Sequence, residues 1–132
     1  MLWIDHLALC AAGKGGESTH LAEDKLFKLD AVEQVAAVSE LDELVKLYRQ
    51  GRNMPLSFYP VTSLAYAKKI ADGKDENAAL SSASYAWEGN QYARGDSLDP
   101  WFDQAMRGRD PLGEPFCQIA QQVYVPMLAA SS

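Results

Sequence analysis

The stretch from Asp99 to Leu112 constrains the fold most, because it combines large aromatic side chains with residues that start and stop helices. Asp99 is suited to accept hydrogen bonds from backbone amides. Pro100 follows at the first helical position, where its missing N–H costs nothing. Gly108 is suited to end this helix early. We therefore predict a short helix that starts after Asp99 and ends at a hinge over residues 107–109.

A last helix is predicted after the Asp110-Pro111 pair, over residues 114–124. Pro126 should forbid its continuation, since proline lacks the amide donor and clashes with the preceding turn. The aromatic pair Trp101 and Phe102 suits either an interface anchor or a core contact that anchors one helix against the sheet, and core is the commoner use.

Length and composition predict one domain, or a fragment of one, over residues 1–132: 48% of the residues are hydrophobic and 23% charged. The net charge of −6 argues against a freestanding nucleic-acid binder, whose affinity depends on Lys and Arg. Cys10 and Cys117 lie in apolar stretches and are expected to be buried thiols rather than a disulfide.

Residues 2–12 are apolar on nearly every face, apart from Asp5 and His6, and this predicts a helix buried on more than one side. A chain that opens on such a helix is expected to be the C-terminal part of a longer subunit. Cut from its parent, the fragment is expected to self-associate through this helix. The two polar residues also interrupt the apolar run that a signal peptide needs, and no stretch is long enough to span a membrane, so the cytoplasm is the expected compartment.

The next segments alternate between strand and helix signals. Residues 18–22 and 25–29 predict a β-hairpin that turns at Glu23-Asp24. Leu41, Leu44, Val45 and Tyr48 recur at helical spacing, which predicts a helix that Ser39 caps and Gly51 ends, with a further turn or two over 32–38.

The segment over residues 54–60 is extended, apolar and interrupted by prolines, so it is expected only at a sheet edge. Thr62 is predicted to cap a helix that runs to Ala71 and is closed by Gly73. Asp75 is predicted to open another that includes Leu80, Tyr85 and Trp87, and residues 88–97 should form an irregular loop. Together these elements predict an α+β fold, a small sheet with a β-hairpin covered by several helices.

Several blocks, in this order and spacing, resemble the C-terminal region of the exodeoxyribonuclease V gamma subunit, RecC. They are residues 3–13, residues 41–51 followed by Pro55-Leu56, residues 99–112, and residues 116–120 with 124–128. The resemblance covers most of this chain but a small fraction of such a subunit. It implies a fragment similar to the restriction-endonuclease-like fold of the RecB nuclease domain, without that domain's metal-binding residues.

This resemblance also implies a non-catalytic structural and interaction domain of the RecBCD helicase and nuclease complex, which acts in double-strand break repair and recombination. The implied partners are the RecB and RecD subunits, with DNA reached through the complex. No catalytic, cofactor-binding or metal-binding residue is carried over, because the family region has none. A generic protein-binding module in an unrelated complex is the further alternative.

A metal-dependent DNA nuclease is the alternative from another class, because Glu23-Asp24-Lys25 matches the acid-any-Lys triplet of nucleases of this fold. Such hydrolysis needs clustered carboxylates to hold Mg²⁺ and a lysine near the attacking water, with Asp5 or Asp30 as the further carboxylate. The preceding strand supplies no second acidic residue, so a solvated turn is the preferred interpretation.

Two other groups of residues are candidates for chemistry. His6 and Cys10 share a helix face and, with His20, suggest metal ligands, but a buried, hydrogen-bonded His6 is favoured. The following three residues are candidate contacts to a partner or to DNA, since guanidinium groups bind anions bidentately: Arg94, Arg107 and Arg109. Aspartates nearby in sequence (Asp96, Asp99, Asp103 and Asp110) favour local ion pairs instead.

Overall fold

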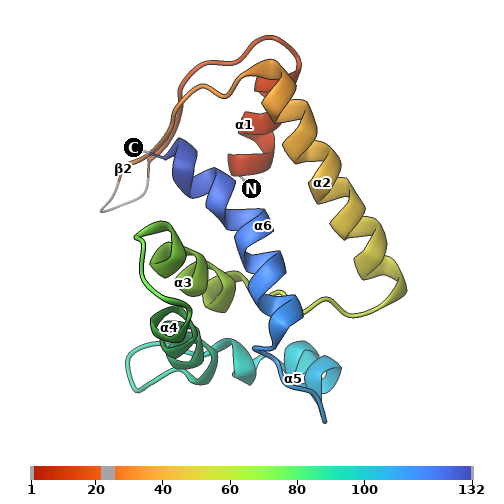
Figure 1. Ribbon diagram of the computed structural model, residues 1–132, viewed down its shortest axis with the longest axis vertical. Helices are drawn as coiled ribbons and strands as arrows, with labels where there is room; N and C mark the ends of the chain where they lie inside the picture. The colour runs from red at the N-terminus through yellow and green to blue at the C-terminus, as the bar shows by residue number, and fades with distance from the viewer. Residues whose placement is uncertain (1, 22–25, 132) are drawn as a thin grey trace. The chain divides into compact units, whose positions relative to one another are not determined.

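The computed structural model describes residues 2–21 and 26–131, and these divide into two compact units. Unit 1 comprises the residues up to Asn53 together with those from Pro126 onward, and unit 2 comprises Met54–Val125. Figure 1 shows the elements of both units, which are mostly helical with one small antiparallel sheet. The α+β class predicted from the sequence is confirmed.

Unit 1 begins with helix α1 (Leu2–Ala11), which buries one stripe of residues: Trp3, His6, Leu7 and Cys10. Their spacing of three, one and three residues is that of a single helix face. Ile4 and Leu9 on other faces are 46% and 50% exposed. The prediction of burial on more than one side is therefore wrong for the described residues, because the chain supplies covering side chains for one face of α1.

The predicted hairpin is present as strands β1 (Ser18–Leu21) and β2 (Leu26–Leu29), which pair antiparallel with Ser18 opposite Leu29. The turn predicted at Glu23-Asp24 lies outside the described residues. The amide of Asp30, just after β2, donates to the carbonyl of Ala130 at 2.7 Å, so this edge of the hairpin is joined to the end of the chain.

Helix α2 (Gln34–Asn53) begins within the further turn or two predicted over 32–38, and it continues two residues past Gly51. Ser39 lies inside it rather than capping it. The side chain of Gln34 instead donates to the carbonyl of Ala11 at 2.9 Å and so connects the first turn of α2 with the end of α1. Gly51 does not end α2, because it lacks the left-handed conformation that a terminating glycine adopts.

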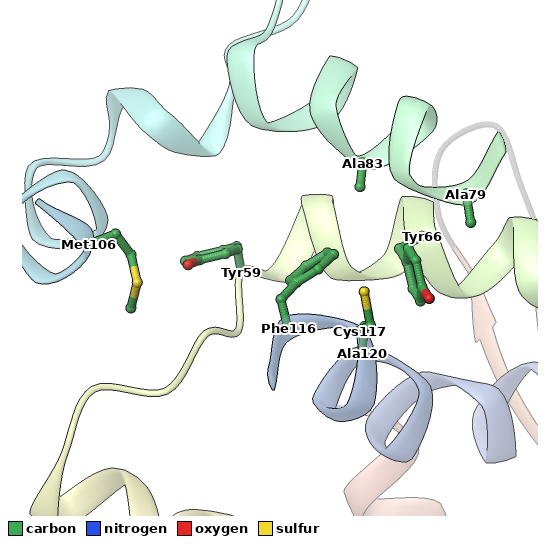
Figure 2. Packing of buried hydrophobic residues seen from close by; sticks show 8 residues of the cluster. All are labelled: Tyr59, Tyr66, Ala79, Ala83, Met106, Phe116, Cys117 and Ala120. Atoms are coloured by element: carbon green, nitrogen blue, oxygen red, sulfur yellow. The ribbon is translucent and has the colours of Figure 1, made fainter. Parts of the chain in front are cut away.

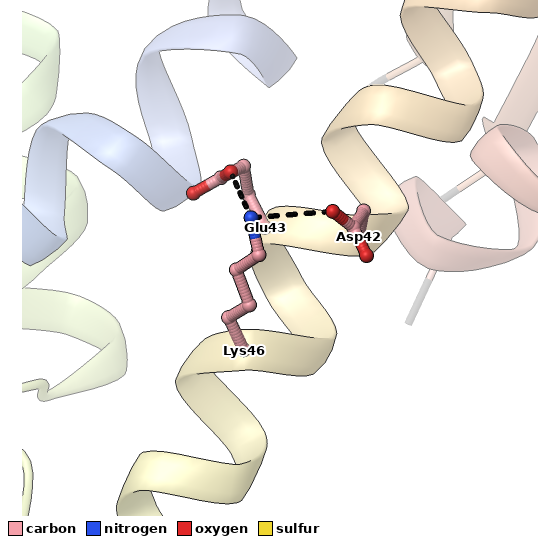
Figure 3. Close-up of polar contacts among 3 residues, drawn as sticks. All are labelled: Asp42, Glu43 and Lys46. Atoms are coloured by element: carbon pink, nitrogen blue, oxygen red, sulfur yellow. Dashed lines mark hydrogen bonds and ion pairs between the residues drawn. The ribbon is translucent and has the colours of Figure 1, made fainter.

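On the exposed surface of α2, the ammonium group of Lys46 lies 3.3 Å from Asp42 and 3.1 Å from Glu43 (Figure 3). The hydrogen bonds to Glu43 and then to Asp42 raise the pKa of Lys46. Because water screens all three groups, these pairs contribute little to the stability of the fold.

Unit 2 contains α3 (Pro60–Ala71), α4 (Glu76–Glu88), the 3-10 turn η1 (Asp96–Leu98), α5 (Pro100–Met106) and the first part of α6 (Glu114–Ala130). The predicted stop at Gly73 is confirmed, since its φ is +78° and its amide donates to the carbonyl of Ile70. The predicted caps at Asp75 and Asp99 are also confirmed: their carboxylates accept from the amides of Ala78 and Trp101.

The segment before α3 corrects two predictions. Residues 54–59 are irregular and belong to no sheet among the described residues. The cap of α3 is at Tyr59 rather than Thr62, and the amide of Tyr59 donates to the hydroxyl of Ser63 at 3.0 Å. Because Pro60 already supplies a helical φ and needs no amide partner, α3 starts three residues earlier than predicted.

Tyr59 is fully buried at the centre of the unit 2 core (Figure 2). Its ring lies 4.6 Å from that of Trp87, 5.2 Å from that of Phe102 and 5.9 Å from that of Phe116, measured between centroids. The remaining buried members of this core are Tyr66, Ala79, Ala83, Met106, Cys117 and Ala120. The irregular segment thus carries the residue around which helices α4, α5 and α6 pack.

Two predictions for the last helices differ in outcome. α5 ends before Gly108, whose φ is +76°, as predicted. α6, in contrast, continues through Pro126 to Ala130. The φ that proline requires is the helical one, so the cost of Pro126 is limited to one missing amide hydrogen bond and the clash of its ring with the preceding turn. Packing of neighbouring residues such as the buried Met127 offsets this cost.

Candidate interaction surface

A trough runs between α3 and α4 on unit 2. It consists of two adjoining depressions of about 340 and 280 Å³ that share Val61, Ala65 and Ser82. Leu64 lines the first depression, and Tyr85 lines the second. Most of these side chains are apolar, and Val61 and Tyr85 are 57% and 73% exposed. The trough is therefore an apolar surface that the described residues of unit 2 leave open.

Basic residues lie at both ends of the trough. Lys68 and Lys69 line the first depression together with Asp72, and Arg94 lines the second. Neither lysine forms an ion pair with a residue that the structure describes. The lining of the trough therefore contains three basic residues and one acidic residue, although the whole chain has a net charge of −6.

The loop that follows α4 positions Arg94. Gly89, with a φ of +75°, and Arg94 form an isolated antiparallel bridge, and the side chain of Asn90 accepts from the amides of Tyr92 and Ala93. Gly95 is packed so closely that a Cβ there would overlap the backbone of Trp87 and Glu88. The loop thus has a defined backbone path that depends on its two glycines.

The first turn of α3 is connected with η1. Thr62 is fully buried, and its amide and hydroxyl both donate to one carboxylate oxygen of Asp96, at 2.9 and 2.8 Å. A carboxylate near a helix N-terminus is also stabilised by the helix dipole. Asp96, which sequence analysis treated as an ion-pair partner for the nearby arginines, is therefore used inside the fold.

The three predicted arginines have different surroundings. Arg94 donates to the carbonyl of Leu98 at 3.1 Å and lines a further depression, of about 290 Å³, with Asp96 and Asp99. Arg107 forms an exposed ion pair with Asp103 at 3.6 Å, which confirms the predicted local ion pair for this arginine. Arg109 is exposed in the turn after α5.

The aromatic pair at the start of α5 is divided between core and surface. Phe102 packs on Tyr59, but Trp101 is 78% exposed. The prediction that both belong to the core is wrong for Trp101, because the short helix α5 presents only one face to the unit. Trp101 is thus available for contact with another molecule.

The buried tyrosines of unit 2 serve packing. Burial raises the pKa of Tyr59 to about 12 and also raises the pKa of Tyr66 and Tyr124. The hydroxyl of Tyr59 donates to the carbonyl of Pro111 at 3.1 Å, and that of Tyr124 donates to the carbonyl of Pro60 at 3.2 Å. The phenols of Tyr59 and Tyr124 are thus held neutral, as hydrogen-bond donors within the fold.

The histidine predicted to be buried and hydrogen-bonded has that role. His6 Nε2 donates to the carbonyl of Asp30 at 2.8 Å, and Nδ1 lies 2.6 Å from the hydroxyl of Ser18, so both ring nitrogens have partners. Cys10 and Cys117 are buried free thiols, as predicted. Across residues 2–21 and 26–131, no three His, Cys, Asp or Glu side chains are grouped so as to hold a metal.

The nuclease alternative rests on Glu23 and Lys25, which lie outside the described residues. Asp5 and Asp30, its further carboxylates, are exposed. No helix in the described part of the chain has both the length and the apolar character needed to cross a membrane.

The trough was not predicted from the sequence. A signal was present, because Val61, Leu64, Ala65, Lys68 and Lys69 recur at the spacing of one helix face. The residues between them, Thr62, Ser63, Tyr66 and Ala67, form the buried face of the same helix. A helix with two such faces has one that contacts its own core and another that is free for a different contact.

The observed geometry defines a small α+β protein of two compact units, whose buried polar groups serve packing and whose exposed features suit binding. Comparison with known proteins adds the family: a family model described as the RecC C-terminal domain matches residues 1–71, more than half of the chain. The chain belongs to this family, and the resemblance inferred from its sequence blocks is confirmed.

Individual relatives agree over nearly the whole chain. The RecBCD enzyme subunit RecC of Escherichia coli K12 is 29% identical over 96% of the chain, and that of Mycobacterium tuberculosis H37Rv is 32% identical over 93%. The subunit of Buchnera aphidicola is 26% identical over 96%. The chain spans only 12% of the length of the first of these relatives, and 12% and 13% of the other two.

Proposed function

We propose that this chain is a non-catalytic structural and interaction domain of a RecBCD-type exodeoxyribonuclease V, which binds RecB and RecD subunits and helps to process DNA ends for repair and recombination. The observation that carries the proposal is the similarity to RecC subunits, which extends over 96% of the chain. DNA hydrolysis belongs to another subunit of the complex in this proposal, and the cytoplasm is its compartment.

The use of the buried polar side chains supports a structural role. His6, Thr62, Tyr59 and Tyr124 all form hydrogen bonds within their own unit. Satisfied buried hydrogen bonds of this kind stabilise packing, and this use supports a structural role. A distant relation to the restriction-endonuclease-like fold remains part of the proposal.

Exposed residues supply the contacts in this proposal. Trp101 and Arg109 lie on the surface near the ends of α5, and aromatic and arginine side chains dominate the binding energy of many interfaces. Arg94, Arg107 and Arg109 are proposed to contact a partner subunit or DNA held by the complex. Their acidic surroundings make a subunit the preferred ligand.

Co-purification tests the proposal. The chain, as part of the subunit that contains it, is expressed with RecB and RecD from the same organism, and affinity capture of one subunit is expected to recover all three. Failure of the subunit to join RecB and RecD would overturn the proposal.

A nuclease assay of the purified chain tests the non-catalytic part of the proposal. No cleavage of linear DNA is expected with Mg²⁺ or Mn²⁺. Cleavage that Glu23→Ala abolishes would show instead that the chain is a metal-dependent nuclease.

A further inference from the structure

The trough between α3 and α4 has the dimensions of a helix-binding groove. α3 has 12 residues, so the trough extends over roughly 18 Å, enough for about three turns of an opposing helix. Its shared lining includes the small side chains of Ala65 and Ser82. Small side chains at a contact allow two helix axes to approach to about 8–10 Å.

The apolar part of the lining specifies one face of the bound segment. Val61, Leu64 and Tyr85 line the trough. An amphipathic helix binds such a groove by inserting apolar residues that recur every three or four positions. The free energy of this binding comes mainly from removing the exposed apolar surfaces of both partners from water.

The charged residues specify the polar face. Lys68 and Lys69 lie at one end of the trough and Arg94 at the other, with Asp72 as the acidic residue in the lining. A ligand carboxylate near Lys68 and Lys69 therefore meets complementary charge, whereas a basic ligand is repelled there. Arg94 lies beside Asp96 and Asp99, so the lysine end supplies most of this attraction. This local charge is opposite in sign to the net charge of the chain.

We infer that this trough binds an acidic amphipathic helix from another protein subunit, with apolar side chains on Val61, Leu64 and Tyr85 and carboxylates facing Lys68, Lys69 and Arg94. The inference rests on the proposed function, because it places the helix in a partner subunit of the same complex. It names a surface and a ligand chemistry that the family similarity does not.

Site-specific cross-linking tests the inference in the assembled complex. The photoreactive residue p-benzoyl-L-phenylalanine is placed at position 61, and in a matched control at position 104 on the exposed surface of α5. Irradiation is expected to join position 61 to a segment of RecB or RecD that has apolar residues at helical spacing and Asp or Glu on both sides. The inference is overturned if position 61 cross-links to DNA, to a second copy of the chain or to its own polypeptide. It is also overturned if position 61 forms no cross-link at all.

A charge variant gives a second measurement. Lys68→Glu is expected to reduce the yield of the position 61 cross-link about tenfold, because a repulsive contact replaces an attractive one. Lys74→Glu makes the same charge change at an exposed site outside the trough and is expected to leave the yield unchanged. Equal yields from both variants contradict the charge argument, and thermal melting by circular dichroism checks that both fold.

The outcomes separate the two proposals. If RecB and RecD co-purify with the subunit but position 61 gives no cross-link to them, the proposed function stands and the helix-binding inference fails. If no complex forms, both fail.

Discussion

Thr62 donates two hydrogen bonds to a single carboxylate oxygen of Asp96, one from its amide at 2.9 Å and one from its hydroxyl at 2.8 Å. This contact joins α3 to η1 across 34 positions of sequence. Since Thr62 is fully buried, its two donors have no access to water when the carboxylate is removed.

Asp96→Ala is therefore expected to lower the free energy of unfolding by about 1–3 kcal/mol, the penalty for leaving buried donors without acceptors. Urea denaturation followed by circular dichroism measures the change. Asp103→Ala, which removes only an exposed ion pair, should cost less than about 1 kcal/mol. If the two substitutions cost the same, the Thr62 contact is not an important stabilising interaction.

His6 links α1 to both strands of the hairpin, through Ser18 at the start of β1 and through Asp30 just after β2. His6→Ala is expected to cost about 2–4 kcal/mol, because it leaves a cavity as well as a carbonyl without its donor. His20 on β1 is exposed, so His20→Ala should change stability by no more than about 0.5 kcal/mol. Equal effects in urea denaturation would show that the ring of His6 is not the link.

Gly95 lies against the backbone at the end of α4 with no space for a Cβ. Gly95→Ala is expected to cost about 1–3 kcal/mol, because backbone rather than a flexible side chain must move. Gly16 has open space around it, and Gly16→Ala should be nearly neutral. Since Arg94 precedes Gly95, the first substitution should also weaken the position 61 cross-link, and thermal melting together with that yield measures both effects.

The predictions that succeeded used local chemistry. Asp75, Asp99 and Gly73 act within one helical turn of their own positions, so residue type alone indicated their roles. The hairpin and the buried His6 were also predictable, since alternation and an apolar neighbourhood are visible in the sequence.

The predictions that failed depended on distant contacts. Ser39 and Gly51 are good helix terminators in isolation, but α2 passes through both and buries Ala37 and Leu47 on the way. Tyr59 could not be identified as a core centre, because its partners Trp87 and Phe116 follow it by 28 and 57 positions. The trough was missed for the same reason: one of its walls belongs to α3 and the other to α4.

Burial of Tyr59 also predicts how stability depends on alkaline pH. The fold raises the pKa of this phenol from 10.0 to about 12, chiefly because burial disfavours the phenolate. The stabilisation is therefore fully present below pH 10 and is lost as the pH rises from about 10 to about 12, because the unfolded chain releases the proton first. Melting temperatures by circular dichroism should fall over this range, and less steeply for Tyr59→Phe than for the parent. Tyr85→Phe is the matched control, since Tyr85 is 73% exposed, and it should keep the parent's slope. A parental slope in Tyr59→Phe would show that this phenol does not contribute to the alkaline loss of stability.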